Sequence, residues 1–229
     1  MAMMSKHTTL LAALVALLWA GASPAAAKII EVGQPAQAVT PSCPTTPCFA
    51  VPRTTGYQAK ADGVRGLFAV PADGRVVAWS ITLSKPGAKQ VADFEKQFGG
   101  PASAGIAILK PAEKLYARTV SASPIRKLSD YFGETVQFPL ETSIPVKKGM
   151  VVGLTVPTWA PALAVGFGND VSWRAASRDK GDCNELSTQT PQRSGTTARY
   201  RCLFRTARLT YTATLITSPP KKAKKKKKN

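Results

Sequence analysis

The sequence predicts an all-β fold for residues 48–218, an antiparallel jelly-roll-like β-sandwich with one short helix. Two observations lead to this fold class. Short segments in which apolar and polar residues alternate follow one another along the chain, and glycine and proline residues separate them. Hydrophobic residues make up 44% of the 229 residues, which is enough for a packed core and excludes a wholly disordered chain. One domain of ordinary size with extensions at both ends fits this length.

Residues 1–27 have the pattern of a cleaved signal peptide. Lys6 precedes an uninterrupted apolar run over residues 10–20, and three alanines before Lys28 provide a cleavage site. The run is too short to span a bilayer of about 30 Å. His7 is the only histidine, so cleavage before Lys28 leaves a chain without histidine. That excludes a Ser-His-Asp triad, a Cys-His pair and a histidine-ligated zinc site.

The next segment, residues 28–47, is rich in proline and threonine and has no periodicity, so we expect a linker. Four cysteines in an exported chain indicate disulfides. We favour Cys43–Cys48 and Cys183–Cys202 because each pair closes a local loop. Pairing between the two ends of the domain remains open. A four-thiolate zinc site is disfavoured because the spacings do not form two C-x-x-C motifs.

The domain begins with a strand in which Val77, Trp79, Ile81 and Leu83 alternate with small or polar residues, and we expect Trp79 in the core. A helix follows, because Val91, Phe94 and Phe98 share one helical face and Gly99-Gly100 ends it. Further alternating segments predict strands up to residue 156. Their apolar positions are Ile106, Ile108, Val136, Phe138, Leu140, Ile144, Val146, Val152, Leu154 and Val156; a more exposed strand contains Tyr116, Arg118, Val120 and Ala122.

The last two predicted strands differ in phase. Tyr200, Cys202 and Phe204 occupy even positions, whereas Leu209 and Tyr211 occupy odd ones. Because alternate side chains point to opposite faces of a strand, a bulge or tight turn must lie near Thr206.

Two segments, residues 73–83 (DGRVVAWSITL) and 143–154 (SIPVKKGMVVGL), resemble parts of uncharacterised exported jelly-roll-like sandwich proteins of high-GC Gram-positive bacteria. The resemblance covers roughly residues 48–217. Met150 stands where an aspartate is common in such turns. The matching motifs are hairpin and core patterns, so the resemblance implies a fold and carries over no catalytic residue.

The formal net charge of +18 is unevenly distributed. The tail at residues 219–229 carries seven lysines and Lys6 is in the signal segment, so 23 basic and 13 acidic residues leave residues 28–220 with a net charge of +10. A lysine run repels itself, so we expect a disordered tail. Lys224, Lys225 and Lys226 are candidate contacts to an anionic cell-wall polymer or lipid surface, with a merely solvated end as the alternative. No specific nucleic-acid partner and no transmembrane segment are expected.

Aromatic residues beside turns are candidate ligand contacts. Trp159 follows a strand and is flanked by prolines, and Trp173 follows Asp170; Tyr131 lies in another turn. A sugar ring needs an apolar face and nearby polar groups, which these residues supply. The alternative is that both tryptophans fill the ends of the core. Arg199, Arg201 and Arg205 share one strand face and form a candidate anion-binding strip; an exposed face protected from edge pairing is the other interpretation.

Acidic residues offer weaker candidates. Residues 179–185 contain several oxygen-bearing side chains but do not match a calcium loop, so calcium is disfavoured and we expect no metal or other cofactor. Asp93/Glu95 and Asp130/Glu134 are the nearest carboxylate pairs for a glycan hydrolase, which needs no histidine.

Together these features predict a secreted or cell-surface, non-catalytic binding module for an anionic or carbohydrate polymer, tethered by the lysine-rich tail. A secreted glycan hydrolase and a structural envelope protein are the alternatives.

Overall fold

The computed structural model describes residues 26–177, 183 and 190–219, and its compact unit spans Ala27–Ser218. Within the described part nearly all regular structure is β, and every strand pairing is antiparallel, as the sequence predicted. The strands are β1 (Ile29–Val32), β2 (Val51–Ala61), β3 (Val64–Arg65), β4 (Gly74–Thr82), β5 (Ser103–Pro111), β6 (Tyr116–Ala122), β7 (Arg126–Lys127), β8 (Thr135–Val146), β9 (Val151–Ala160), β10 (Leu163–Val165), β11 (Ser172–Ser177), β12 (Thr197–Arg205), β13 (Ala207–Leu209) and β14 (Tyr211–Thr217). The helices are α1 (Ala88–Phe98) and the short 3-10 turns η1 (Glu113–Leu115) and η2 (Ser129–Tyr131).

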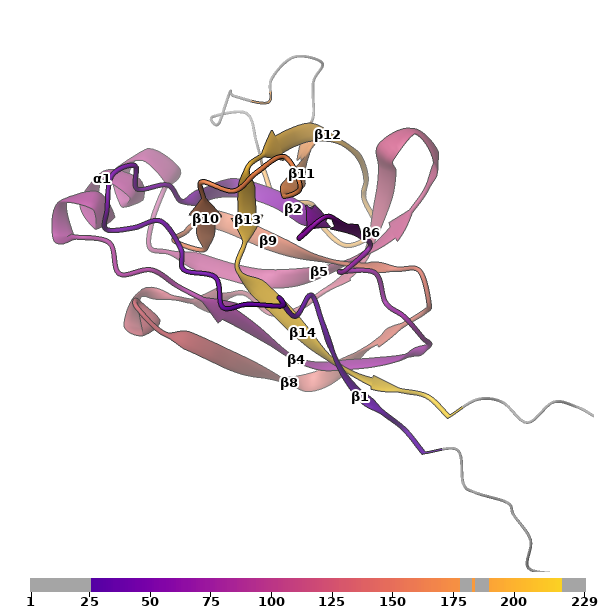
Figure 1. Cartoon of the computed structure of the whole chain (residues 1–229). Coiled ribbons are helices and arrows are strands. Elements are labelled where there is room, and N and C mark those ends of the chain that lie inside the picture. Colours follow the sequence, from indigo (N-terminus) through magenta and orange to yellow (C-terminus); the bar gives the residue numbers. More distant parts are fainter. Residues whose placement is uncertain (1–25, 178–182, 184–189, 220–229) are drawn as a thin grey trace, which may run out of the picture. The chain divides into compact units, whose positions relative to one another are not determined.

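Two sheets form the body of this unit (Figure 1). The smaller sheet has the order β1-β14-β4-β8. In the larger one β2 pairs with β9, β9 with β5, β5 with β6, β6 with β12, β12 with β11, and β11 with β2. These pairings close into a ring of six strands, which the sequence did not predict. The jelly-roll order is not confirmed by these pairings.

The main core lies between the smaller sheet and the ring strands β5 and β9. Trp79 and Phe138 face it from β4 and β8 with ring centroids 4.8 Å apart, opposite Ile106 and Leu154. Trp79 is fully buried, as predicted. One detail differs from the prediction: a register shift between Val76 and Ala78 turns Val76 into the core in place of Val77.

A second, smaller cluster contains side chains from all six ring strands. Its members are Tyr57, Ala107, Leu109, Ala117, Val151, Ala176, Ala198 and Tyr200. A six-stranded ring leaves little interior space, which explains the small residues. Gly153 belongs to this arrangement, because an added Cβ would lie 2.9 Å from the carbonyl oxygen of Gly56.

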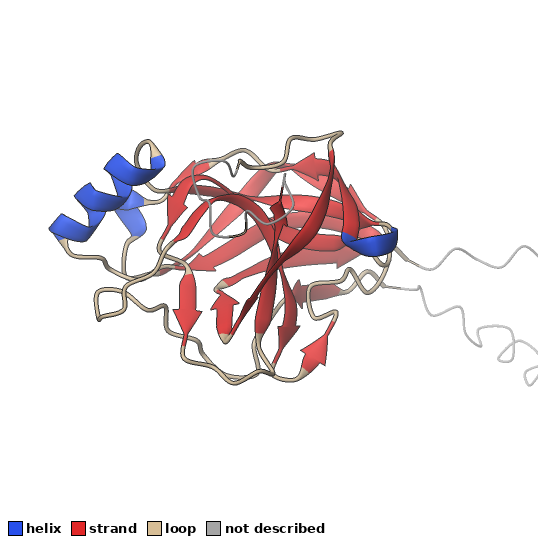
Figure 2. Ribbon diagram, turned by 90° about the horizontal axis from the view of Figure 1, so that it is seen from above, coloured by secondary structure: helices blue, strands red, loops and turns tan. Residues whose placement is uncertain are grey.

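The predicted helix is confirmed as α1, which Figure 2 shows at one end of the strands. It ends at Gly99, whose φ of 85° is a left-handed conformation that glycine adopts without steric cost. Phe94 packs on Trp159 with ring centroids 5.0 Å apart, and the Trp159 Nε1 donates a hydrogen bond to the Gly100 carbonyl oxygen at 3.1 Å. Trp159 therefore fastens the helix to β9.

The predicted phase change near Thr206 is also confirmed. Thr206 has a φ of 58° and separates β12 from β13. The side chains of Cys202 and Leu209 consequently both face the core, although one position is even and the other odd. The disulfides Cys43–Cys48 and Cys183–Cys202 form as favoured from the sequence.

The expected linker at residues 28–47 is wrong in its first part. Residues 29–32 form β1, which pairs with β14 from Ile29 opposite Ile216 to Val32 opposite Ala213. The run Ile29-Ile30-Glu31-Val32 is short, so its β-forming character is hidden beside the proline-rich stretch that follows. This strand brings the next residues over the smaller sheet.

Candidate functional site

A hollow of about 370 Å³ opens on the outer face of the smaller sheet. Its floor comes from β1, β4, β8, β13 and β14, and residues 33–39 form a wall. Most floor side chains carry a hydroxyl, amide or charged group. The uncharged polar ones are Ser80, Thr82, Thr135, Gln137, Thr210 and Thr212, and the wall adds Gln34.

Strand register explains why polar side chains gather there. Gln137 of β8 pairs with Ser80 of β4, and Ser80 pairs with Thr212 of β14. Paired residues in an antiparallel sheet share a face, so these three form one row away from the core. The row ends at Glu31 of β1, whose carboxylate accepts hydrogen bonds from the hydroxyls of Thr212 and Thr214.

The wall is positioned by Gly33, which directly follows β1. Its backbone N–H donates to the Leu67 carbonyl oxygen at 3.1 Å, and its φ is +88°. An added Cβ would lie 2.3 Å from Cε1 of Phe68. Only glycine fits this close approach, so the chain turns there and continues as Gln34, Pro35, Ala38 and Val39 along the hollow.

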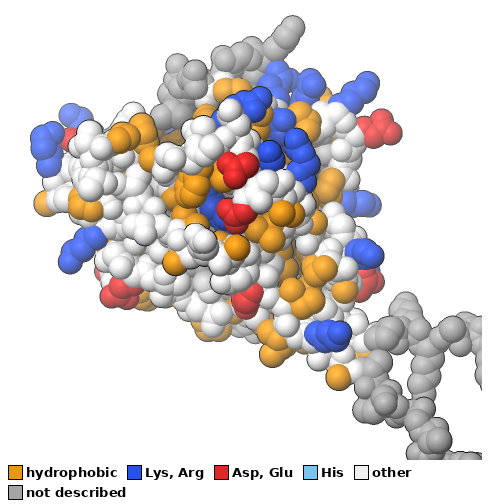
Figure 3. All heavy atoms as spheres, in the orientation of Figure 1, with side chains coloured by type: hydrophobic (Ala, Val, Ile, Leu, Met, Phe, Trp, Pro, Cys, Tyr) orange, Lys and Arg blue, Asp and Glu red, His pale blue; other side chains and the backbone are white. Residues whose placement is uncertain are grey.

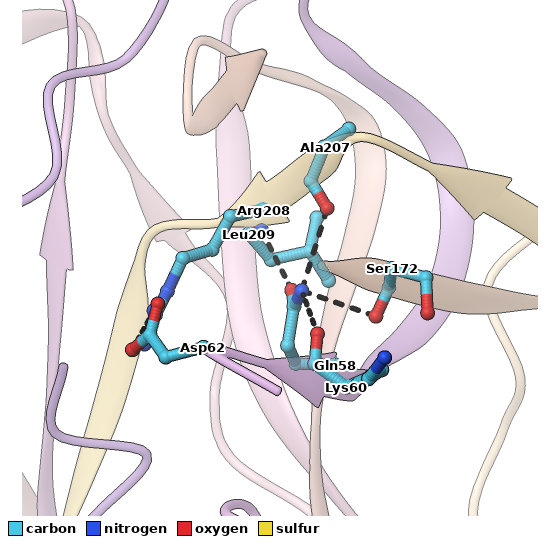
Figure 4. Close-up of polar contacts among 7 residues, drawn as sticks. All are labelled: Gln58, Lys60, Asp62, Ser172, Ala207, Arg208 and Leu209. Carbon is cyan, nitrogen blue, oxygen red and sulfur yellow. Dashed lines mark hydrogen bonds and ion pairs between the residues drawn. The ribbon is translucent and has the colours of Figure 1, made fainter. Parts of the chain in front are cut away.

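Arg208 of β13 is the basic residue in the floor of the hollow. Its side chain is 2% exposed, and its Nη1 lies 3.0 Å from the Asp62 Oδ2 (Figure 4). The Arg208 Nη2 is buried and has no hydrogen-bond partner among the described residues. Figure 3 shows acidic atoms near the centre of the view with basic atoms beside them. The guanidinium group thus has one satisfied nitrogen and one unsatisfied nitrogen.

Gln58 of β2 holds the backbone beside Arg208. Its Nε2 donates to the carbonyl oxygens of Lys60, Ser172 and Ala207, at 3.1, 3.1 and 3.4 Å. Its Oε1 accepts from the Leu209 N–H at 2.9 Å (Figure 4). This buried amide joins β2, β11 and β13, so the position of Arg208 is set by the ring.

The predicted arginine strip lies on the outer face of β12. Arg118 of β6 pairs with Thr197, two residues from Arg199, and Lys110 of β5 pairs with Arg118. These cations therefore share one sheet face, here called the basic face: Lys110, Arg118, Arg199, Arg201 and Arg205. Figure 3 shows Lys and Arg side chains gathered in the upper part of the view.

Among the described residues, no carboxylate forms an ion pair with the basic face. The ion pairs among the described residues are Lys89–Asp93, Arg126–Glu141, Lys147–Asp73 and Arg208–Asp62, and none includes a residue of this face. Arg199 donates from Nε to the Lys114 carbonyl oxygen at 3.1 Å and lies over the Tyr116 ring. The Nε of Arg201 is buried and lacks a hydrogen-bond partner within the described part of the chain.

The predicted aromatic ligand contacts do not form a surface site. Trp159 and Trp173 lie within β9 and β11 and are 0% and 3% exposed, so neither offers a face to a sugar. Both lie at the ends of their strands beside loops, but their side chains point into the core, which is the alternative interpretation of these tryptophans. Tyr131 is half-buried, with its ring edge against Phe138 at 5.4 Å. Asp170 is exposed in the loop before β11, while Trp173 points into the core.

The acidic candidates are scattered. Asp93 is exposed on α1 and pairs with Lys89 at 3.0 Å, and Asp130 and Glu134 are exposed around η2. No group of three or more metal-binding side chains occurs in the described residues. Of the segment 179–185 only Cys183 is described, and Lys224, Lys225 and Lys226 lie outside the described residues.

Buried tyrosines are the groups with shifted pKa values. Burial raises the pKa of Tyr57, Tyr200 and Tyr211. The Tyr211 hydroxyl donates to the Val152 carbonyl oxygen at 2.8 Å. The Tyr200 hydroxyl is also buried, so the shifts of Tyr200 and Tyr211 reflect packing within the two cores.

Sequence reasoning missed Glu31, Asp62 and Arg208. Arg208 alternates with Leu209 and Tyr211, which is a signal that it points away from the core face. Its burial comes from residues far away in the chain, which no local pattern reveals. Comparison with protein-family models, with curated proteins and with solved structures found no match to this chain.

Proposed function

We propose that this protein is an exported, non-catalytic binding module that holds an anionic polymer of the cell surface along its basic face. The lysine-rich tail adds attraction that is not specific for sequence or structure. The observation that supports this proposal is the basic face itself: five cations on β5, β6 and β12 that form no ion pair with a carboxylate in the described part of the chain.

Charge and geometry both favour a polyanion. Lys110, Arg118 and Arg205 are exposed, whereas Arg199 and Arg201 are half-buried. An arginine without an acidic neighbour keeps its positive field, and its planar fork matches carboxylate, sulfate and phosphate oxygens. Arg199 is held by Tyr116 and the Lys114 carbonyl oxygen, so one guanidinium of the row is already ordered. An ordered cation loses less conformational entropy when it binds.

Export is supported by the covalent structure. The chain has two disulfides and no free cysteine among the described residues, as is typical of proteins that fold in an oxidising compartment. The described residues include no helix long and apolar enough to cross a membrane.

Binding of the purified protein to immobilised dextran sulfate, with uncharged dextran as reference, tests the proposal. Changing Arg199, Arg201 and Arg205 together to glutamine removes three charges from the face. At about 1 kcal/mol per cation near an anionic surface, we expect affinity to fall about 100-fold at low salt. The effect should shrink as added salt screens the charges.

The matched control replaces Lys85, Lys96 and Lys148 with glutamine, which removes the same charge at exposed positions off the basic face. A second control deletes residues 221–229. Equal losses in the arginine and lysine variants would show that only net charge matters and would refute a site on β12. Full binding by the arginine variant that vanishes on tail deletion would assign the binding to the tail alone.

A further inference from the structure

We infer that the hollow on the smaller sheet is a second binding site, which takes an uncharged sugar residue. This site differs from the basic face in its strands and in its chemistry. The hollow has a volume of about 370 Å³, which lies within the range of small-molecule sites, about 300–1,000 Å³.

The charge of the hollow disfavours an anionic ligand. Arg208 is already paired with Asp62 at 3.0 Å, and Glu31 adds a carboxylate without a cationic partner in the described part of the chain. These three groups sum to one negative charge. An entering carboxylate or phosphate would meet the half-buried Glu31 carboxylate, and the like charges would repel each other. A neutral ligand avoids this cost.

The polar groups of the hollow match a polyol. Each carboxylate oxygen of Glu31 accepts one threonine hydrogen bond and retains a lone pair for a ligand hydroxyl. Ser80, Thr135 and Gln137 can donate or accept along the same row. Acceptors, and groups that can either donate or accept, thus lie within one recess.

The wall supplies the apolar surface that a sugar also requires. Pro35, Ala38 and Val39 line the side formed by residues 33–39. A pyranose ring has hydroxyls at its edge and C–H groups on its faces, so it can contact the aliphatic wall while its edge faces the polar row. Lipids lack the hydroxyls for the row, and nucleotides carry the charge that Glu31 disfavours.

Calorimetric titration of the purified protein with cellotriose, maltotriose and chitotriose tests the inference, with trigalacturonate as the anionic comparison. We expect saturable binding of at least one neutral trisaccharide and weaker binding of trigalacturonate. Glu31→Gln keeps the shape of the side chain but removes the charged acceptor, and should weaken neutral binding about tenfold. Glu134→Gln, an exposed acid outside the hollow, is the matched control.

Gln137→Ala provides a second variant at an exposed position, in case Glu31→Gln alters the pairing of β1. The arginine triple variant of the basic face should retain sugar binding, and Glu31→Gln should retain dextran sulfate binding. Each variant therefore tests one site without affecting binding at the other. No saturable binding of any neutral trisaccharide, tighter binding of trigalacturonate, or equal affinities for wild type, Glu31→Gln and Gln137→Ala would each overturn the inference.

Discussion

Replacing Gly33 with alanine tests how the wall of the hollow is held in place. The added Cβ would lie 2.3 Å from Cε1 of Phe68, far inside van der Waals contact. The Phe68 ring has no free space to move into, because it is 1% exposed and its centroid lies 4.6 Å from that of Tyr211. The backbone after β1 must therefore shift, or the core must rearrange.

Two separate costs contribute to the expected loss. A left-handed conformation at an L-residue costs about 1–2 kcal/mol. Forcing a methyl group into a filled core costs about 1–3 kcal/mol more. Gly166 has a φ of +87°, nearly the same as the +88° of Gly33, and no described atom lies within 4 Å of its added Cβ. Gly166→Ala should therefore show only the first cost, roughly 1–2 kcal/mol.

Urea unfolding followed by tryptophan fluorescence measures both variants. We expect Gly33→Ala to lose about 1–3 kcal/mol more than Gly166→Ala, with unchanged dependence on urea concentration. Equal losses in the two variants would refute the reasoning, since they would show that Phe68 yields without cost. Because Gly33 begins the wall, Gly33→Ala should also lower the affinity of any ligand that binds in the hollow.

Three further predictions concern the core. Replacing Gln58 with leucine removes the amide that bonds three backbone carbonyl oxygens and the Leu209 N–H, and leaves these buried groups without that partner. The free energy of unfolding in urea should fall by about 3 kcal/mol, and a fall of less than about 1 kcal/mol would contradict this role. Trp159→Ala should lower the free energy of unfolding by about 3–5 kcal/mol and remove the contacts that hold helix α1 on β9. Hydrogen exchange of the α1 amides should then become faster, and an unchanged exchange rate would disprove the anchoring. Because burial raises the pKa of Tyr200 and Tyr211, the unfolded state loses their protons first above about pH 10. Stability should then fall by up to about 1.4 kcal/mol per pH unit for each tyrosine, and stability that stays constant from pH 9 to 11 would argue against their burial.

Local patterns in the sequence predicted the elements well where a strand or helix has one buried face. Trp79, Ile106 and Leu154 face the core as alternation indicated, and Val91, Phe94 and Phe98 lie on one helix as their spacing indicated. The phase change at Thr206 followed from the same reasoning. Val77 was assigned to the wrong face because a bulge shifts the register within β4.

The functional residues divide in the same way. The arginines of β12 were found because alternation alone places them opposite Tyr200 and Cys202. Trp159 and Trp173 were placed beside turns correctly, but a local pattern does not show whether a side chain at a strand end points outward or into the core, where both of these lie. The wall of the hollow was missed because β1 is four residues long and gains its partner from the other end of the chain.

The sequence by itself determined the all-β class, the helix α1 and the basic character of β12, and it favoured the two local disulfides, because each depends on residues close together in the chain. Only the tertiary structure decided that β2 and β11 close the ring and that β1 pairs with β14. In the second pairing Glu31 and Thr214 are more than 180 residues apart in the sequence. The same long-range pairing buries Arg208 beside Asp62 and brings Glu31 to the hollow. Backbone hydrogen bonds between strands do not depend on side-chain identity, so a sequence shows which residues favour a strand but not which strand they will join.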